Sequence, residues 1–192
     1  MDKQRDVAPL SALGTGRLRA GPVRTQKPVY VDLLPPCNAG CPAGENIQAW
    51  LAHSRAGRHE AAWRQLTADN PFPAIHGRVC YHPCETACNR RQLDGAVSVH
   101  SVERFLGDLA IEQGWTFTRP AERSGKKVLV VGGGPSGLSA AYHLSMLGHD
   151  VVIFDSGELP GGMMRYGIPA YRLPRDVIDA EIARIAALGV QL

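Results

Sequence analysis

The sequence predicts an α+β protein with more than one domain: a small all-helical domain, followed by the first part of a Rossmann-like domain of the ββα type. For the second domain, the apolar run Val128–Val131 leads directly into a glycine-rich turn at 132–137, and helical periodicity follows as far as Leu147. A strand, a glycine turn and a helix in that order are typical of a βαβ unit. For the first domain, all five cysteines fall between residues 37 and 88, among helical patterns.

The composition narrows the class of protein. The chain has 192 residues, of which 44% are hydrophobic and 20% charged, as in soluble proteins of one or two domains. No apolar run approaches the ~20 residues of a membrane span, and the N-terminus lacks the apolar core of a secretory signal. We therefore expect a cytoplasmic protein without a membrane partner. In that reducing compartment, five cysteines indicate metal or redox chemistry before disulfides.

The positive net charge of +3 comes from the N-terminal segment. Residues 1–28 carry six basic and two acidic residues, show no hydrophobic period and are interrupted by Gly and Pro. We expect this segment to be a flexible basic extension. It contains no interleaved aromatic residues, so the sequence predicts no nucleic-acid partner.

Residues 29–115 are predicted to form the helical domain. Val29–Leu34 is apolar enough to pack, and Pro35-Pro36 is expected to stop any regular element. Apolar spacing predicts two helices around residues 47–54 and 61–66, which pair as an αα-hairpin over the cysteine loop. Trp50 and Trp63 are interpreted as core residues.

A third helix is expected from about Ser101 to Gln113. Residues 116–126 are interpreted as a linker to the second domain, which begins at residue 127.

The cysteines occur in two groups. Cys37 and Cys41 form C-x₃-C-P with Pro42, a spacing also found at the end of a bacterial ferredoxin run. Cys80, Cys84 and Cys88 form the second group. Pro83 suits the first turn of a helix, which would stack Cys84 and Cys88 on one face and direct the helix N-terminus toward an anionic thiolate cluster.

The turn at 132–137 has the pattern G-x-G-x-x-G, formed by Gly132, Gly133, Gly134, Pro135, Ser136 and Gly137. Gly132 permits the tight turn, Gly134 lets the backbone approach a pyrophosphate, and Gly137 lets the helix pack closely on the strand. A second apolar run, Val151–Phe154, ends in Asp155, eighteen residues after Gly137. A carboxylate at this place accepts the hydroxyls of an adenosine ribose, so the pattern predicts a dinucleotide site.

Beyond Asp155 lies a long irregular segment with Gly161-Gly162, which in a compact domain is usually functional. A helix is predicted over Asp176–Leu188, and a strand begins at Val190. One and a half βαβ units do not close a dinucleotide domain. Residues 127–192 are therefore expected to be the truncated front part of a domain in a longer protein.

Across residues 30–192, the chain resembles the N-terminal part of the glutamate synthase small subunit and the related front half of dihydropyrimidine dehydrogenase. The resemblance rests on C-x₃-C-P at 37–42, Gly77-Arg78-Val79-Cys80 with Cys84 and Cys88, Val102-Glu103, the segment 130–137, Pro160-Gly161-Gly162, Tyr166-Gly-Ile-Pro169 and Arg172-Leu-Pro174.

This resemblance implies a helical [4Fe-4S] domain and an FAD domain into which an NAD(P)H domain is inserted beyond residue 192. In the family, a hydride from NAD(P)H reduces FAD, and the clusters pass electrons to a partner subunit or domain. The turn 132–137, Asp155, Gly161 and Gly162 fall on the FAD contacts. The family usually has Glu where Asp155 stands. No catalytic residue is predicted in this part, which we expect to be incomplete and inactive alone.

The resemblance also implies metal ligands. Cys41, Cys80, Cys84 and Glu103 would hold one cluster, and Cys37 and Cys88 would be half of a second. The C-x₂-C that the family places ahead of Cys37 is absent, because Val29 and Asp32 occupy those positions. One cluster is therefore expected. In the alternative, Glu103 is a solvated helix residue, and Cys37 or Cys88 completes the set.

Two other functions are compatible with the motifs. The C-x₃-C pairs also suit a zinc-stapled binding or nucleotide-binding module without redox activity. The other alternative is a dehydrogenase that binds NAD at the 132–137 turn. Gly161-Gly162 is a flavoprotein feature in the family, and a plain dehydrogenase has no need of it.

Overall fold

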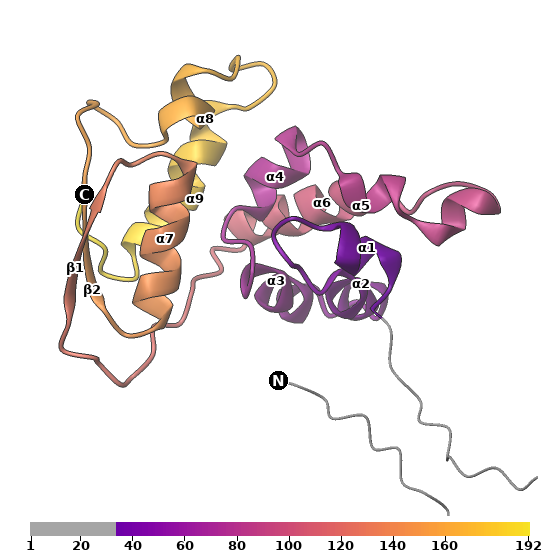
Figure 1. The fold of residues 1–192 in the computed structure, drawn as a ribbon, viewed down its shortest axis with the longest axis horizontal. Coiled ribbons are helices and arrows are strands. Elements are labelled where there is room, and N and C mark those ends of the chain that lie inside the picture. Colours follow the sequence, from indigo (N-terminus) through magenta and orange to yellow (C-terminus); the bar gives the residue numbers. More distant parts are fainter. Residues whose placement is uncertain (1–33) are drawn as a thin grey trace, which may run out of the picture. The chain divides into compact units, whose positions relative to one another are not determined.

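The computed structural model describes residues 34–192, of which residues 35–192 form one compact unit. The predictions made for residues 1–28, and for the packing of Val29–Leu34 as a whole, lie outside the described residues. Figure 1 shows a helical segment followed by a segment with two strands, as the sequence predicts.

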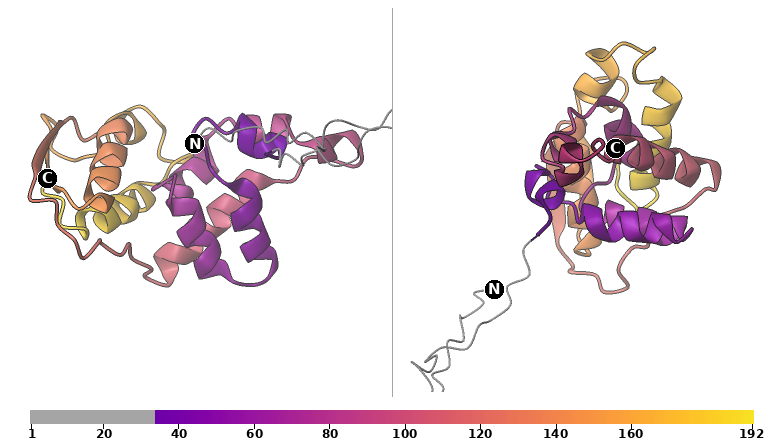
Figure 2. Two further views of the ribbon diagram at one scale, coloured as in Figure 1. Left: turned by 60° about the horizontal axis from the view of Figure 1, so that its bottom comes forward. Right: turned by 90° about the vertical axis from the view of Figure 1, so that its right-hand side faces the viewer.

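The helical segment begins at Pro36 and ends at Glu112. Its helices are α1 (Pro36–Gly40), α2 (Ile47–Arg55), α3 (His59–Thr67), α4 (Pro73–Val79), α5 (Pro83–Thr86), the 3₁₀ helix η1 (Asn89–Gln92) and α6 (Val99–Glu112). The predicted pairing of α2 and α3 is confirmed, and the two helices lie side by side in Figure 2. Trp50 and Trp63 are fully buried, as expected for core residues.

One local prediction is wrong, and one helix was not predicted. Pro36 occupies the first turn of α1, where its missing N–H costs nothing. Helix α4 was not predicted. Helix α5 ends at Thr86, and Cys88 has an extended conformation, so Cys84 and Cys88 do not stack on one helical face.

Helices α4 and α6 cross at two glycines that allow the backbones to touch. A Cβ at Gly107 would lie 2.2 Å from the backbone nitrogen of Ala74, and a Cβ at Gly77 would lie 2.5 Å from that of Arg104. Both distances are far below van der Waals contact. The crossing therefore fixes Cys80, which follows α4, relative to Glu103, which lies on α6.

The second segment contains β1 (Lys127–Val131), α7 (Pro135–Met146), β2 (Asp150–Phe154), α8 (Gly162–Tyr166) and α9 (Arg175–Ala186). The strands pair in parallel, with Lys127 opposite Asp150, and Gln191 makes a further parallel bridge to Val152. Helices α7 and α9 lie on the same side of the strands (Figure 1). Although β1 is an apolar run, its side chains Leu129 and Val131 are exposed.

Side chains from the two segments interlock within this unit. Phe117, in the predicted linker, stacks on Trp63 of α3 with the ring planes 10° apart. The hydroxyl of Tyr142 on α7 donates to the carbonyl oxygen of Thr67 at 2.6 Å. The buried carboxylate of Glu181 on α9 accepts a hydrogen bond from the backbone nitrogen of Ala74, in the first turn of α4. This contact with the second segment therefore fixes the position of helix α4, which leads to Cys80.

No helix within residues 34–192 combines the length and the apolar character needed to cross a bilayer.

Candidate cofactor sites

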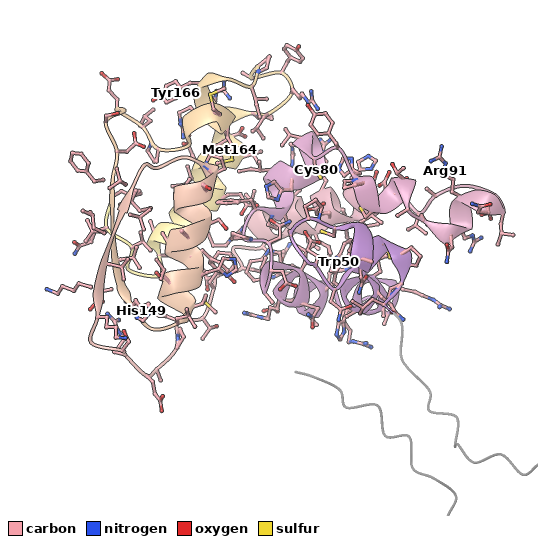
Figure 3. All side chains as sticks on the ribbon, viewed as in Figure 1. Trp50, Cys80, Arg91, His149, Met164 and Tyr166 are labelled. Carbon is pink, nitrogen blue, oxygen red and sulfur yellow. The ribbon has the colours of Figure 1, made fainter. Side chains whose placement is uncertain are left out.

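Four of the predicted metal ligands line one cavity in the helical segment. Cys41, Cys80, Cys84 and Glu103 come from four separate places: the loop after α1, the end of α4, the short helix α5 and the middle of α6. The cavity has a volume of about 260 Å³, several times the ~30 Å³ that one water molecule occupies. It therefore has room for a polyatomic group. Figure 3 labels Cys80 at the end of α4.

Backbone N–H groups lie near two of the sulfur atoms of this cavity. The amides of Ala43, Gly44 and Glu45 face the thiol of Cys41, and the amide of His82 donates to Sγ of Cys80 at 3.3 Å. His82 takes a left-handed conformation with φ of 53°, which is uncommon for a residue other than glycine. The turn between Cys80 and Cys84 thus places both thiols at one cavity.

The ionisation of these thiols reflects their crowding. Burial, and then the neighbouring Cys41, raise the pKa of Cys84 to about 12, with smaller contributions from Glu85 and Cys80. Burial also raises the pKa of Cys41. Thiols must lose their protons to bind metal, so a cationic centre among them would be strongly stabilised by three thiolates. The donor set and the N–H groups fit an anionic iron–sulfur cluster, whose sulfur atoms accept such hydrogen bonds.

Glu103 is buried, with 5% of its surface exposed, so the alternative of a solvated helix residue is wrong. Burial, and then the charge of Glu45, raise the pKa of Glu103 well above its ordinary value. Asn70 donates from Nδ2 to Oε1 of Glu103 at 2.7 Å and to Oε1 of Glu45 at 2.8 Å. Two carboxylates therefore share one buried amide at the wall of the cavity.

Cys37 and Cys88 do not line this cavity. The thiol of Cys37 faces Oδ1 of Asn38 at 3.7 Å. Cys88 precedes η1, and hydrogen bonds from the backbone amides of Val97, Arg90 and Arg91 lower its pKa. Among residues 34–192, no three His, Cys, Asp or Glu side chains converge closely enough to bind a single metal ion.

The predicted nucleotide residues gather at the start of α7. Gly132 has φ of 102° and follows β1, and a Cβ at Gly137 would lie 1.9 Å from the carbonyl oxygen of Gly132. Gly134 caps α7, followed by Pro135 and Ser136 in its first turn. The backbone nitrogen of Gly161 donates to the carbonyl oxygen of Gly133 at 2.7 Å, and a Cβ at Gly162 would lie 2.8 Å from Cα of Gly134.

Asp155 lies at the end of β2, beside this turn. Its Oδ2 accepts a hydrogen bond from the backbone nitrogen of Gly133, and its Oδ1 accepts one from Gly157 at 2.6 Å. The Gly133 and Gly157 amides lower the pKa of Asp155, which is therefore ionised at neutral pH. A half-buried, ionised carboxylate next to a helix N-terminus fits recognition of a ribose and its adjoining pyrophosphate.

Several residues at this cavity were not identified from the sequence. Glu45, His76 and His82 line it, and Asn70 lies behind the two carboxylates. No local pattern marks Glu45 or Asn70, because they meet across 25 residues of sequence. The position of His82 between Cys80 and Cys84 was the available signal for its place in the cavity.

Comparison with protein-family models finds two matches. The model described as dihydropyrimidine dehydrogenase domain II, 4Fe-4S cluster, matches residues 33–115. The model described as an NAD(P)-binding Rossmann-like domain matches residues 130–179. The first match contains the cysteine cavity, and the second contains the glycine turn and Asp155.

Curated relatives match most of this chain. The NADP(+)-dependent formate dehydrogenase subunit beta of Moorella thermoacetica is 36% identical over 93% of the chain and 28% of its own length. The glutamate synthase [NADPH] small chain of Bacillus subtilis is 38% identical over 79% of the chain and 31% of its length. The NAD-dependent dihydropyrimidine dehydrogenase subunit PreT of Salmonella typhimurium is 33% identical over 82% and 38%.

The chain spans roughly a third of the length of these three relatives. All three are named as dehydrogenase or synthase subunits that use a nicotinamide nucleotide, and the identities are similar. The order of a 4Fe-4S domain before a Rossmann-like segment agrees with the fold. The chain therefore belongs to the oxidoreductase family of the glutamate synthase small chains and the dihydropyrimidine dehydrogenase subunits.

Proposed function

We propose that this chain is the electron-transfer part of an NAD(P)H-dependent oxidoreductase that uses FAD and one [4Fe-4S] cluster. In this proposal, the helical domain 29–115 holds the cluster, 116–126 is the linker, and 127–192 binds the adenosine diphosphate half of FAD. The NAD(P)H site lies beyond residue 192. The observation that carries the proposal is the single cavity lined by Cys41, Cys80, Cys84 and Glu103.

The roles follow from the chemistry of these side chains. The three thiolates would bind iron, and the Glu103 carboxylate, a harder donor, would complete the set. A bound cluster supplies a site that accepts and releases one electron at a time. The N–H groups that face Cys41 and Cys80 support the negative charge of the ligands. The crossing of α4 and α6 maintains the spacing between Cys80 and Glu103.

At the second site, the first turn of α7 would bind the pyrophosphate, and Asp155 would accept the ribose hydroxyls. The Gly161-Gly162 loop packs backbone to backbone on the turn at 132–137, which leaves no side chain between the loop and the phosphates. This loop supports FAD over NAD, because Gly161-Gly162 is a flavoprotein feature in the family that the chain resembles.

The relatives are named as a subunit or a small chain, which supports the presence of a partner subunit. We propose that a catalytic partner subunit or domain exchanges electrons with the cluster.

Anaerobic reconstitution with iron and sulfide tests the first site. We expect a brown protein with about four irons per chain, the content of one cluster. Cys80→Ser should lose the colour, and Cys88→Ser, the matched control outside the cavity, should keep it. A colourless protein that binds zinc instead would contradict the proposal and support a structural zinc module.

Titration with FAD, ADP and NAD tests the second site. We expect FAD and ADP to compete for it and Asp155→Ala to weaken both. Tight binding of NAD with exclusion of FAD would contradict the flavin assignment and favour a dehydrogenase site.

A further inference from the structure

Glu45 and Glu103 pose a question of ligand choice, because both are buried and both line the cluster cavity. Either carboxylate is chemically able to bind iron. The two differ in what already occupies their oxygen atoms.

Both oxygens of Glu45 accept hydrogen bonds. Oε2 receives the indole Nε1–H of Trp50 at 3.2 Å, and Oε1 receives the amide of Asn70 at 2.8 Å. Trp50 is fully buried on α2 and is labelled in Figure 3. An oxygen that already accepts a buried hydrogen bond turns toward a metal only by leaving its donor without a partner, which is costly in a buried site.

Glu103 is engaged at one oxygen only. Its Oε1 accepts from Asn70 at 2.7 Å, and its Oε2 makes no hydrogen bond within residues 34–192. One oxygen therefore orients the carboxylate, while the other remains available. This is the usual arrangement of a metal-binding carboxylate, whose second oxygen is held by a hydrogen-bond donor.

Asn70 also ties together the segments that carry the ligands. Its Oδ1 accepts from the backbone nitrogen of Phe72 at 3.0 Å, at the residue that precedes α4. Its Nδ2 reaches Glu45, in the loop after Cys41, and Glu103 on α6. The amide is 1% exposed and uses its oxygen and both of its N–H groups. Its orientation is set by chemistry, because only the nitrogen donates to two carboxylates.

We propose that Asn70 is a positioning residue that selects Glu103 over Glu45 as the carboxylate ligand of the cluster. This inference rests on the proposed function, since it presumes a cluster in the cavity. It assigns no contact between Asn70 and iron: the amide acts through the two carboxylates.

The test uses the whole chain, reconstituted with iron and sulfide, reduced with dithionite and examined by electron paramagnetic resonance. In the wild-type background, Glu103→Gln should change the spectrum, and Glu45→Gln should leave it unchanged. In Asn70→Leu, we expect cluster retention to fall about 10- to 100-fold, the usual effect of removing a ligand's hydrogen-bond partner. The spectrum of any remaining cluster should then become sensitive to Glu45→Gln.

Thr67→Val is a matched control, because Thr67 is buried and its hydroxyl bonds only within α3, to the carbonyl oxygens of Trp63 and Arg64. It should lower stability without altering the spectrum. If Asn70→Leu does not fold, Asn70→Ser is used, with the same expected direction. If neither Asn70 variant folds, the comparison of Glu45→Gln with Glu103→Gln in the wild-type background still shows which carboxylate is the ligand.

The inference would be overturned if folded Asn70→Leu had the spectrum and the cluster retention of the wild type. It would also be overturned if, in the wild-type background, the spectrum responded to Glu45→Gln and not to Glu103→Gln. These results differ from failure of the proposed function. In that case, the wild-type chain would take up no cluster, or Cys80→Ser would leave its iron content unchanged.

Discussion

The crossing of α4 and α6 gives the sharpest test of how the cluster cavity is held. In Gly107→Ala, the added methyl would lie 2.2 Å from the backbone nitrogen and 2.5 Å from Cα of Ala74. Normal contact between carbon atoms is about 3.5–4 Å, so the two helices must separate by more than 1 Å. Backbone atoms cannot rotate away, and the cost of overpacking is therefore expected near the upper end of its range, about 3 kcal/mol.

Alanine in place of glycine stabilises a helix by about 1 kcal/mol, so the net loss of stability is about 2 kcal/mol. For a chain of this size, that lowers the melting temperature by about 4–8 °C. Since the helices carry Cys80 and Glu103, we also expect the reconstituted protein to retain less iron. The assays are thermal unfolding of the apo chain and iron content after desalting.

Gly167→Ala is the matched control. There the nearest atom to an added Cβ is the flexible end of Met163, at 2.4 Å, which is free to move. Its iron content should equal that of the wild type. A Gly107→Ala protein with wild-type melting and full iron content would refute the reasoning that this contact maintains the site.

Further predictions concern single side chains. Burial raises the pKa of Glu181 to about 7, above its ordinary value of 4.5, so the folded chain retains a proton that the unfolded chain releases. The free energy of unfolding should therefore fall as pH rises from about 4.5 to 7, and this group contributes up to about 3 kcal/mol of that fall. In Glu181→Gln, the free energy of unfolding measured with urea should depend less on pH across the same range. Asp155→Ala should weaken ADP binding about 10- to 100-fold by calorimetry, since it removes a charged acceptor, whereas equal affinity would contradict its role at the ribose. Cys37→Ser and Cys88→Ser, single or combined, should keep about four irons per chain, and a loss of the cluster would place one of them among its ligands.

The nucleotide segment was readable from the sequence because its signals are local. The turn at 132–137 needs glycine for reasons that lie within the turn itself, such as the contact between Gly137 and the carbonyl oxygen of Gly132. The exposure of Leu129 and Val131 was not predictable in the same way, since a strand's own sequence does not reveal whether both of its faces are covered.

The helical segment was harder to predict. Helix α4 escaped prediction because Pro71, Pro73 and Gly77 resemble breakers, yet Pro73 starts the helix and Gly77 permits the approach of α6. The spacing of Cys84 and Cys88 suggested a shared helical face, but the helix is only four residues long.

Glu103 was predicted as a metal ligand from the family resemblance and not from a local sequence pattern. Its link to Glu45 runs through Asn70, which lies 33 residues away from it in sequence. Contacts of that kind become visible only in the folded chain.

We propose above that Cys41, Cys80, Cys84 and Glu103 hold a single [4Fe-4S] cluster. Mössbauer spectroscopy of the chain reconstituted with ⁵⁷Fe, combined with iron and sulfide analysis, tests it most directly. We predict about four irons per chain, with one iron distinguishable from the other three because it is bound by a carboxylate. Eight irons per chain, or four equivalent thiolate-bound irons that remain unchanged in Glu103→Ala, would contradict the account.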